Sequence, residues 1–415
     1  MAMDDIYSKL KSIVSSHCSD YDDSDALEFI KKLNYNKDER LVKIANELLL
    51  TDFNNEDVMN IKIKNRVLSE LETFQSKSVL ESKPRDLQVV LTNKCNLNCK
   101  MCANDKIDWD LKERTLNSIK NNMKYFERIL WQGGEAFLYP DFLGLLELAH
   151  ENKVIQSIMT NGLLIDEKTA DVITKTDTDI VISIDSVNPT VYEDIRIGAK
   201  FEQLLNSLEL LYKYKGINNS KTSFDMATII MHSTCRELFD FIDFAEKYHF
   251  RSICLNQIGI NDKDQSESLP QEDVDFLRSN KIKLLTRMKN SSVRFEMNLS
   301  CFFDEPKKEV NKEQNNKEEH KKQEEPICKP IICEQKQNLY CQRPWNSIYI
   351  EYKGDFMPTC KCYGGSMAFI SDQTIEEIWN SDIFVNYRKQ INENKFQDCC
   401  SNLCVHTKHD NWRYK

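Results

Sequence analysis

The stretch DLQVVLTNKCNLNCKMC, residues 86–102, decides how the rest of the chain is interpreted. Its first half is a β-rich apolar run, which predicts a buried strand. Its second half places Cys95, Cys99 and Cys102 within eight residues, directly after that strand. Three thiolates this close together can each hold one iron of a cubane cluster and leave the fourth iron open, as catalytic metals require. A structural zinc site is the alternative, but zinc usually takes paired C-x2-C spacing and four protein ligands.

The sequence after this stretch alternates β-rich runs with helical patterns. Alternation of this kind predicts right-handed βαβ units on a parallel sheet. Six strands are too few for a complete eight-stranded barrel, so we expect an α/β fold with a partial (β/α)6 TIM-like barrel. The expected strands are at 86–92, 128–134, 155–162, 179–185, 223–231 and 252–259, and the expected helices at 113–126, 141–151, 166–175, 201–214 and 235–248.

Composition divides the chain into four predicted parts. Residues 1–83 show only helical periodicity and form an N-terminal helical extension. Residues 84–304 form the partial barrel. Residues 305–327 are almost entirely charged and polar, which is typical of a solvated linker. Residues 328–415 form a small C-terminal domain, with a hairpin around 346–360 and a helix over 374–391.

Charge and hydropathy exclude several classes of protein. The 415 residues carry 56 Lys and Arg against 66 Asp and Glu, for a net charge of −10, so nucleic acids and anionic membranes are poor partners. We find no apolar run long enough for a membrane span and no secretory signal, and we expect a cytoplasmic protein. In a reducing cytoplasm, the 15 cysteines are more consistent with metal ligands than with disulfides.

The spacing C-x3-C-x-Φ-C after a first strand resembles the radical S-adenosylmethionine (SAM) superfamily, with Met101 at the Φ position. Gly133-Gly134-Glu135, at the end of the second β-rich run, is similar to the GGE motif of that superfamily. Two glycines let a backbone edge approach a ligand closely. The resemblance implies that Cys95, Cys99 and Cys102 hold a [4Fe–4S] cluster, and that the GGE segment receives the ammonium group of SAM.

Further cofactor-binding residues are expected at the ends of later strands. Asn161 closes the third run, and Ser183 and Asp185 close the fourth, where polar side chains meet at the mouth of such sheets. The alternative for Ser183 and Asp185 is a polar cap for the next helix. Arg196 resembles a family position that contacts the SAM carboxylate or the substrate; a surface arginine is the alternative. No protein residue is assigned as a catalytic group.

The C-terminal domain, beginning at Cys341-Gln-Arg-Pro-Trp345, resembles the SPASM/twitch domain of many radical SAM enzymes. That resemblance implies one auxiliary [4Fe–4S] cluster held by Cys341, Cys360, Cys400 and Cys404. The sequence lacks the full cysteine run of two-cluster SPASM domains. Four remaining cysteines keep a further cluster open, and a structural zinc site is another alternative; these cysteines are Cys328, Cys333, Cys362 and Cys399. Among the scattered cysteines, we expect Cys235 and Cys254 to be small core residues.

The activity that the resemblance implies is reductive cleavage of SAM to a 5′-deoxyadenosyl radical, followed by hydrogen abstraction from a substrate. The expected reaction is oxidative modification of a ribosomally made peptide or protein, by cross-linking or dehydrogenation, with a flavodoxin- or ferredoxin-type reductant. The alternative is dehydrogenation or rearrangement of a small molecule such as an amino sugar. A hypothesis of another class is a non-catalytic iron–sulfur electron carrier.

Overall fold

The computed structural model describes residues 57–105, 107–259, 265–299, 341–352, 356–358, 372–393 and 395, together with Ser8. The charged segment 305–327 lies outside the described residues, as does most of the N-terminal extension. Three of the four predicted auxiliary-cluster cysteines, Cys360, Cys400 and Cys404, also lie outside them.

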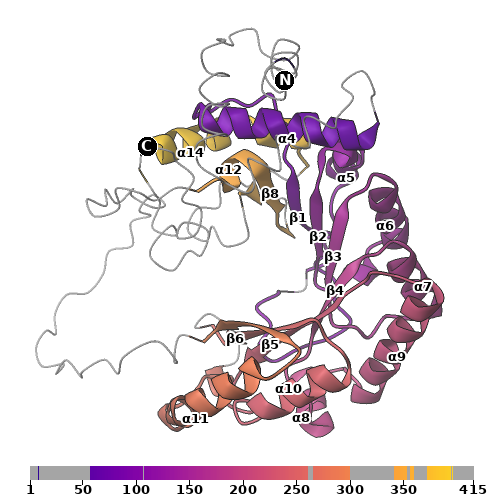
Figure 1. Cartoon of the computed structure of the whole chain (residues 1–415), viewed down its shortest axis with the longest axis vertical. Helices are drawn as coiled ribbons and strands as arrows, with labels where there is room; N and C mark the ends of the chain where they lie inside the picture. Colours follow the sequence, from indigo (N-terminus) through magenta and orange to yellow (C-terminus); the bar gives the residue numbers. More distant parts are fainter. Residues whose placement is uncertain are drawn as a thin grey trace, which may run out of the picture.

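A nine-stranded sheet forms the centre of the described structure, in the order β7-β6-β5-β4-β3-β2-β1-β8-β9. All six expected strands are present, and each is parallel to its neighbour along the chain. Figure 1 shows the sheet curving from β1 to β6, which confirms the α/β fold with a partial barrel. These six strands are β1 (Asp86–Val90), β2 (Arg128–Gln132), β3 (Ile155–Thr160), β4 (Asp179–Ser183), β5 (Phe224–Ile230) and β6 (Ser252–Gln257).

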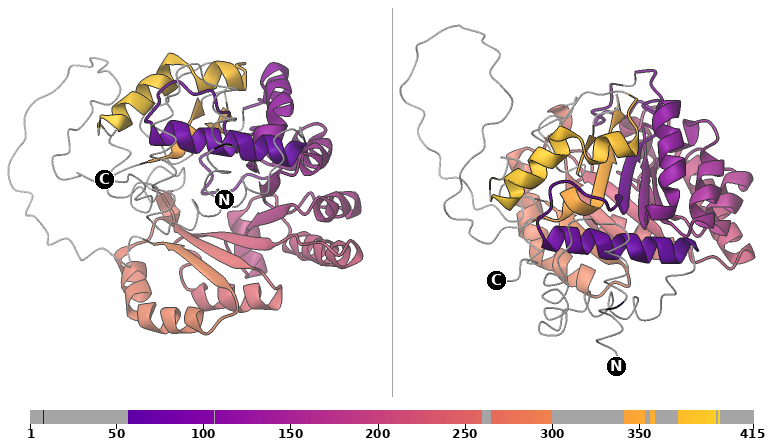
Figure 2. Two further views of the ribbon diagram at one scale, coloured as in Figure 1. Left: turned by 45° about the horizontal axis from the view of Figure 1, so that its top comes forward. Right: turned by 90° about the horizontal axis from the view of Figure 1, so that it is seen from above.

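Helices connect the strands and cover the outer side of the curved sheet (Figures 1 and 2). The five expected helices are present, the first of them followed by a short 3-10 turn at Met123–Tyr125. Asp166 illustrates why they begin where they do, because its carboxylate accepts a hydrogen bond from the Thr169 amide at the helix start. These helices are α5 (Glu113–Asn122), α6 (Phe142–Glu151), α7 (Glu167–Lys175), α9 (Phe201–Ile217) and α10 (Leu238–Lys247).

Three further elements of the barrel were not predicted. Strand β7 (Arg294–Asn298) extends the parallel sheet beyond β6, and α11 (Gln271–Lys289) precedes it. A short helix, α8 (Pro189–Ile195), follows β4. Strand β7 has no fully buried residue, so its sequence lacks the apolar run that marks the other strands.

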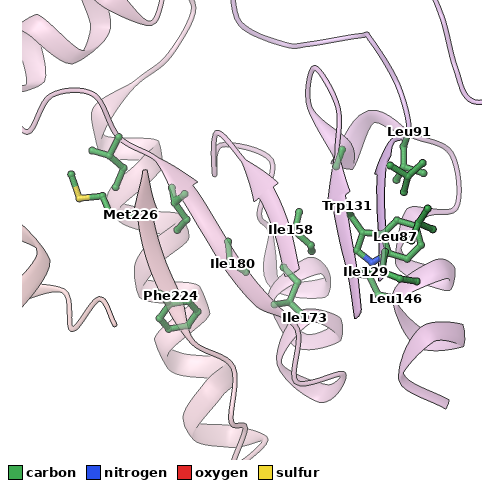
Figure 3. Packing of buried hydrophobic residues seen from close by; sticks show 14 of the residues in the cluster. Leu87, Leu91, Ile129, Trp131, Leu146, Ile158, Ile173, Ile180, Phe224 and Met226 are labelled. Atoms are coloured by element: carbon green, nitrogen blue, oxygen red, sulfur yellow. The ribbon is translucent and has the colours of Figure 1, made fainter. Parts of the chain in front are cut away.

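The barrel core lies between the sheet and its outer helices. Leu87, Ile129 and Ile158 come from alternate positions of neighbouring strands and are almost completely buried. Figure 3 shows these side chains with Trp131 and Ile180 on one face of the sheet. Because successive strand residues point to opposite faces, the residues between them face the inside of the barrel. Full burial of each such apolar side chain stabilises the fold by about 1.5–3 kcal/mol.

The C-terminal segment joins the barrel sheet directly. Strand β8 (Ser347–Ile350) pairs in parallel with β1, and β9 (Phe356–Met357) pairs antiparallel with β8, consistent with the predicted hairpin. The predicted helix over 374–391 is two helices, α13 (Ile375–Trp379) and α14 (Asp382–Asn392). The break occurs because Ser381 is the N-cap of α14, its side chain accepting a hydrogen bond from the Phe384 amide.

Helix α4 (Val58–Phe74) and the segment after it pack against the C-terminal elements. The Trp345 indole, from α12 (Arg343–Asn346), donates to the Lys77 carbonyl at 2.8 Å, and the Trp379 indole donates to the Ser82 carbonyl at 2.6 Å. The buried Arg388 donates to the Ser78 carbonyl at 3.0 Å. Residues far apart in sequence therefore form one layer at the β1 end of the sheet (Figure 2).

Candidate functional site

A cavity of about 460 Å³ opens at the carboxyl ends of the first strands, beside the cysteine loop. The structure brings most of the predicted site residues to its wall. Those that line it are Cys95, Cys99, Met101, Cys102, Gly133, Gly134, Asn161, Ser183, Asp185 and Arg196. Parallel strands bring their carboxyl ends to one edge of a sheet, which explains why residues so distant in sequence meet there.

The cysteine loop is held by the segment that follows α8. The amide of Asn98 donates to the Ile197 carbonyl at 2.8 Å, and the amide of Lys100 donates to the Ile195 carbonyl at 2.9 Å. These two hydrogen bonds lie on either side of Cys99 and of Arg196. They therefore place the Cys99 thiol and the Arg196 side chain against the same cavity.

A buried ion pair lies beside Cys99. The Arg196 guanidinium donates to the Asp185 carboxylate at 2.5 Å, and both side chains are less than one-tenth exposed. Burial raises the pKa of the Cys99 thiol to about 11, although the charge of Arg196 acts in the opposite direction. Without metal, Cys99 is therefore protonated at neutral pH, and a bound cation would have to displace that proton.

The glycine pair forms a backbone wall of the cavity. The amide of Gly134 donates to the Thr92 carbonyl, and the amide of Glu135 donates to the Lys94 carbonyl, each at 2.8 Å. A Cβ atom on Gly134 would lie 2.3 Å from the Lys94 carbonyl oxygen, far closer than atoms can approach. Glycine is thus required for the second strand to end against the segment that leads into the cysteine loop.

Glu135 does not line the cavity. Its carboxylate is buried and accepts hydrogen bonds from the Thr160 hydroxyl and the Asn161 amide, each at 2.8 Å. Burial raises the pKa of this carboxyl group, which has no ion-pair partner among the described residues. In the structure Glu135 ties the end of β2 to the end of β3, and its contact with SAM stays a prediction.

Asn161 links the third strand to the cysteine loop. The side-chain NH2 group of Asn161 donates to the side-chain oxygen of Asn96 at 2.8 Å. The side-chain oxygen of Asn161 accepts a hydrogen bond from the backbone amide of Leu163 at 2.9 Å. The loop is therefore fixed from two sides, by Asn161 and by the segment after α8. Rigid support of this kind is what a metal site needs from its surroundings.

Sequence reasoning missed several residues of the cavity wall. Gln132 and Met159 are inward-facing residues near the ends of β2 and β3, and strand alternation alone could have found them. Tyr349 reaches the wall because β8 pairs with β1, with Gln88 opposite Tyr349. No local pattern in the sequence signals that pairing.

The remaining described cysteines lie outside this cavity. Cys341 is buried in the core, away from the cavity wall. Cys235 is also fully buried, in agreement with its predicted core role. For Cys254 the core prediction is wrong, because the side chain is only half-buried and alternates with the buried residues Ile253 and Leu255 of β6. Cys254 therefore faces the inside of the barrel.

The cavity fits an iron–sulfur cluster and SAM. It offers three cysteine side chains, a side-chain-free backbone edge and a buried cation. Two buried polar atoms find no hydrogen-bond partner among the described residues: the Nε of Arg196, which lines the cavity, and the hydroxyl of Tyr192 on helix α8. Buried polar groups are nearly always bonded, so these atoms fit a site that is completed by a ligand.

Comparison with known families gives the same result. A family model described as "Radical SAM superfamily" matches residues 89–245, and one for the SPASM domain, described as "Iron-sulfur cluster-binding domain", matches residues 341–404. Residues 89–245 belong to the radical SAM superfamily. The chain carries a C-terminal SPASM domain, and the cofactors of such enzymes are SAM, the SAM-binding [4Fe–4S] cluster and auxiliary iron–sulfur clusters.

Individual relatives differ in activity. The chain is 26% identical over 280 residues to the radical SAM cyclopropyl synthase TigE of Paramaledivibacter caminithermalis, covering 56% of each chain. It is 24% identical over 219 residues to GTP 3′,8-cyclase of Synechocystis sp., covering 48% of this chain and 64% of the relative. It is 27% identical over 164 residues to the mycofactocin maturase MftC of Mycolicibacterium smegmatis, covering 38% and 41%. The chain thus spans only 41–64% of the length of these relatives.

Among solved structures, the fold is similar to that of SuiB from Streptococcus suis. The TM-score is 0.56 at 14% sequence identity, and the match covers 92% of this chain and 83% of SuiB. SuiB bound to its precursor peptide SuiA gives a TM-score of 0.55 at 16% identity, covering 88% and 80%. At this level of identity the similarity concerns the fold. Separately, none of the helices in the described residues has the length and apolar character needed to cross a membrane.

Proposed function

We propose that this radical SAM enzyme oxidatively modifies a ribosomally made peptide or protein, by forming a cross-link or by dehydrogenation. The observation that carries the proposal is the convergence of the three-cysteine loop, the Gly133–Gly134 edge and the Asp185–Arg196 pair on one cavity. In this proposal the cysteines bind the cluster, the glycine edge leaves room for SAM, and the ion pair supplies a charged donor. All three features line the same cavity.

In this proposal Cys95, Cys99 and Cys102 hold the catalytic cluster. With SAM bound, this cofactor pair would supply the radical chemistry, by which hydrogen would be abstracted from the substrate. The protein's own contribution is orientation and the exclusion of other reactants. The bare backbone edge at Gly134 and the polar side chains of Asn161 and Ser183 line the space that SAM would occupy.

The Asp185–Arg196 pair supplies charge to this space without a mobile proton. Arg196 stays protonated at any physiological pH, because guanidinium groups have a very high pKa and Asp185 is bonded to it. One further donor of Arg196, its Nε, has no partner within the part of the chain that the structure describes. The amino-acid carboxylate of SAM, or a carboxylate of the substrate, is the kind of group that such a donor would bind.

A peptide substrate is supported by the relatives. The structural neighbour SuiB has been solved with a precursor peptide, and MftC is named a maturase. An auxiliary cluster held by Cys341, Cys360, Cys400 and Cys404 would accept the electron that a net oxidation releases. A flavodoxin- or ferredoxin-type protein would supply the electron for SAM cleavage.

A small-molecule substrate is the second candidate. The named GTP 3′,8-cyclase relative favours it, and the chain aligns with this relative over 48% of its own length. In this case the reaction would be a dehydrogenation or rearrangement, for which an amino sugar is one candidate substrate.

The test is an anaerobic assay of the reconstituted full chain with SAM and a chemical reductant. The proposal expects formation of 5′-deoxyadenosine, and loss of two hydrogen atoms from a short peptide encoded beside the gene, measured by mass spectrometry. Formation of 5′-deoxyadenosine without any change in the peptide would favour a small-molecule substrate. Absence of 5′-deoxyadenosine with full iron content would mean a non-catalytic electron carrier.

A further inference from the structure

A second cavity, of about 300 Å³, lies toward the amino ends of β1, β2 and β3. Gln88, Leu130 and Ser157 are in its wall and lie opposite one another on the three strands. They alternate with residues such as Leu87 and Ile129, whose side chains pack in the core (Figure 3), so they face the inside of the barrel. The proposed function gives this amino-end cavity no role.

The amino-end cavity and the cavity beside the cysteine loop follow each other along the same strands. Gln88 and Leu130 line the first, and Val90 and Gln132, each two residues further along, line the second. Residues two apart on a strand point to the same face and are roughly 7 Å apart. A ligand in the cavity beside the cysteine loop would therefore reach the amino-end cavity by extending along the inner face of the sheet.

Two arginines and one aspartate give the amino-end cavity a positive charge. Arg128 and Arg343 each donate to a different oxygen of the Asp86 carboxylate, both at 3.3 Å. These are the only charged side chains among the described residues of its wall, so two positive charges face one negative charge. Neither guanidinium has a further hydrogen-bond partner within the described part of the chain. Each keeps several N–H donors for a carboxylate or phosphate group of a ligand.

Gln88 indicates what else the ligand carries. Its side-chain oxygen is buried, and no described residue donates a hydrogen bond to it. A buried amide oxygen normally has a donor, so this atom points to a ligand that brings an N–H or O–H group. An acidic residue of a peptide carries both features, because its carboxylate lies a few bonds from the N–H groups of the main chain.

We propose that the amino-end cavity binds an acidic residue of the peptide substrate. Arg128 and Arg343 hold its carboxylate, and a neighbouring peptide N–H donates to the Gln88 oxygen. This inference rests on the proposed function, in which the substrate is a peptide. Arg128 and Gln132 are the two ends of β2, roughly 13 Å apart, a distance that an extended peptide covers in about four residues. The acidic residue is therefore expected about four residues from the one that is modified.

The test measures the binding of two small probes to the anaerobically reconstituted full chain by saturation-transfer NMR. The acidic probe is N-acetyl-glutamate N-methylamide, which is a single acidic peptide unit. The neutral probe is N-acetyl-glutamine N-methylamide, which has the same shape without the charge. The acidic probe is expected to bind the unmodified protein about tenfold more tightly than the neutral one.

Three variants locate the binding site. Arg343→Gln and Arg128→Gln are each expected to weaken binding of the acidic probe about tenfold. Because the Arg128 side chain is 65% exposed, its replacement should leave the fold nearly unchanged. Arg287→Gln is the matched control, since its side chain is 30% exposed, against 29% for Arg343, and it pairs with carboxylates of helix α10. This control is expected to bind the acidic probe as tightly as the unmodified protein.

Equal binding of the two probes would overturn the inference, and so would equal affinity for the acidic probe in all three variants. Tighter binding of inorganic phosphate than of the acidic probe, lost in Arg343→Gln, would overturn it too, because the cavity would then fit a phosphate-bearing small molecule. Failure of the proposed function is distinguishable, since probe binding needs no turnover. In that case the acidic probe would still bind, while the peptide encoded beside the gene would stay unmodified.

Discussion

Arg196 lies opposite Cys99, because backbone amides on either side of the cysteine donate to carbonyls on either side of the arginine. The cysteine loop is thus attached to the segment that carries the buried cation. This arrangement places a positive charge beside a predicted iron ligand before any cofactor binds. It also means that the Arg196–Asp185 pair supports the loop as well as the cavity.

The first prediction concerns Asp185. Replacing Asp185→Asn leaves the Arg196 charge buried without its partner, and breaking such a pair costs about 3–5 kcal/mol. Asp194→Asn removes an ion pair from the same segment, but the Asp194 side chain is 64% exposed, so its loss should cost at most about 1 kcal/mol. Urea unfolding of the metal-free proteins measures both changes. An equal decrease in the free energy of unfolding for the two variants would show that the buried pair stabilises the fold no more than the exposed one.

The second prediction compares two glycines. Gly134→Ala forces a Cβ atom against the Lys94 carbonyl oxygen and should cost about 1–3 kcal/mol of stability. Because the strained backbone leads into the cysteine loop, iron incorporation should fall as well. Gly216→Ala, in helix α9, meets no atom within 4 Å and should stabilise the protein by up to about 1 kcal/mol. The two substitutions should therefore shift the unfolding midpoint in opposite directions, and a shared direction would contradict the predicted clash.

The sequence was sufficient to predict that the cysteine loop and the glycine pair lie close together, because the motifs that mark them are local in sequence. The cysteines and the glycine pair follow directly on apolar strands, and parallel strands bring such positions to one edge. The side-chain direction of Glu135 could not be predicted in this way. Whether its carboxylate faces the cavity or the neighbouring strand depends on the Thr160 hydroxyl and the Asn161 amide, which approach only in the folded protein.

The third prediction concerns Arg388, which joins the C-terminal helices to the segment after α4. Its guanidinium donates to the carbonyls of Pro344 and Trp379 at 2.7 and 2.8 Å and is fully buried. Arg388→Met leaves these acceptors unsatisfied and should cost about 3 kcal/mol or more. Lys389→Met, at the exposed neighbouring position, should change stability by no more than about 0.5 kcal/mol. Thermal unfolding followed by circular dichroism measures both variants. An equal loss of stability in the two would argue against a special role for the buried Arg388 side chain.

The fourth prediction concerns the pH dependence of His232. Its Nδ1 lies 2.6 Å from the Asp273 carboxylate, and this hydrogen bond raises the pKa of His232. Because the folded pKa is the higher one, the pair stabilises the fold fully below about pH 6.5, the ordinary pKa of histidine. That stabilisation is lost as the pH rises through the folded pKa.

Asp273→Asn should therefore lower the pKa of His232 toward its ordinary value. Glu272→Gln, which removes an exposed neighbouring charge, should lower it much less. An NMR titration of the His232 ring proton, assigned with His232→Gln, measures both shifts. If Glu272→Gln lowered the pKa of His232 as much as Asp273→Asn, the raised pKa would come from the negative charges around His232 and not from its hydrogen bond to Asp273.

Long-range pairing explains what could not be predicted from the sequence. Tyr349 enters the cavity wall only because β8 pairs with β1, more than 250 residues away along the chain. Strand β7 was missed because every residue in it is at least partly exposed. Cys254 was placed in the core because its strand is apolar, and only the alternation about Ile253 and Leu255 shows that it faces the barrel interior. The Tyr349 error thus comes from long-range pairing, and the other two arise because residue type does not reveal which face of a strand is buried.

The most direct test of the account is an iron count on two anaerobically reconstituted proteins. One is the unmodified chain, and the other carries Cys95→Ala, Cys99→Ala and Cys102→Ala together. If these cysteines hold the catalytic cluster, the triple variant should bind about four fewer iron atoms per chain. The iron that it retains, about four atoms for one auxiliary cluster or about eight for two, would belong to the C-terminal cysteines. Equal iron content in the two proteins would contradict the assignment of the catalytic cluster to this loop.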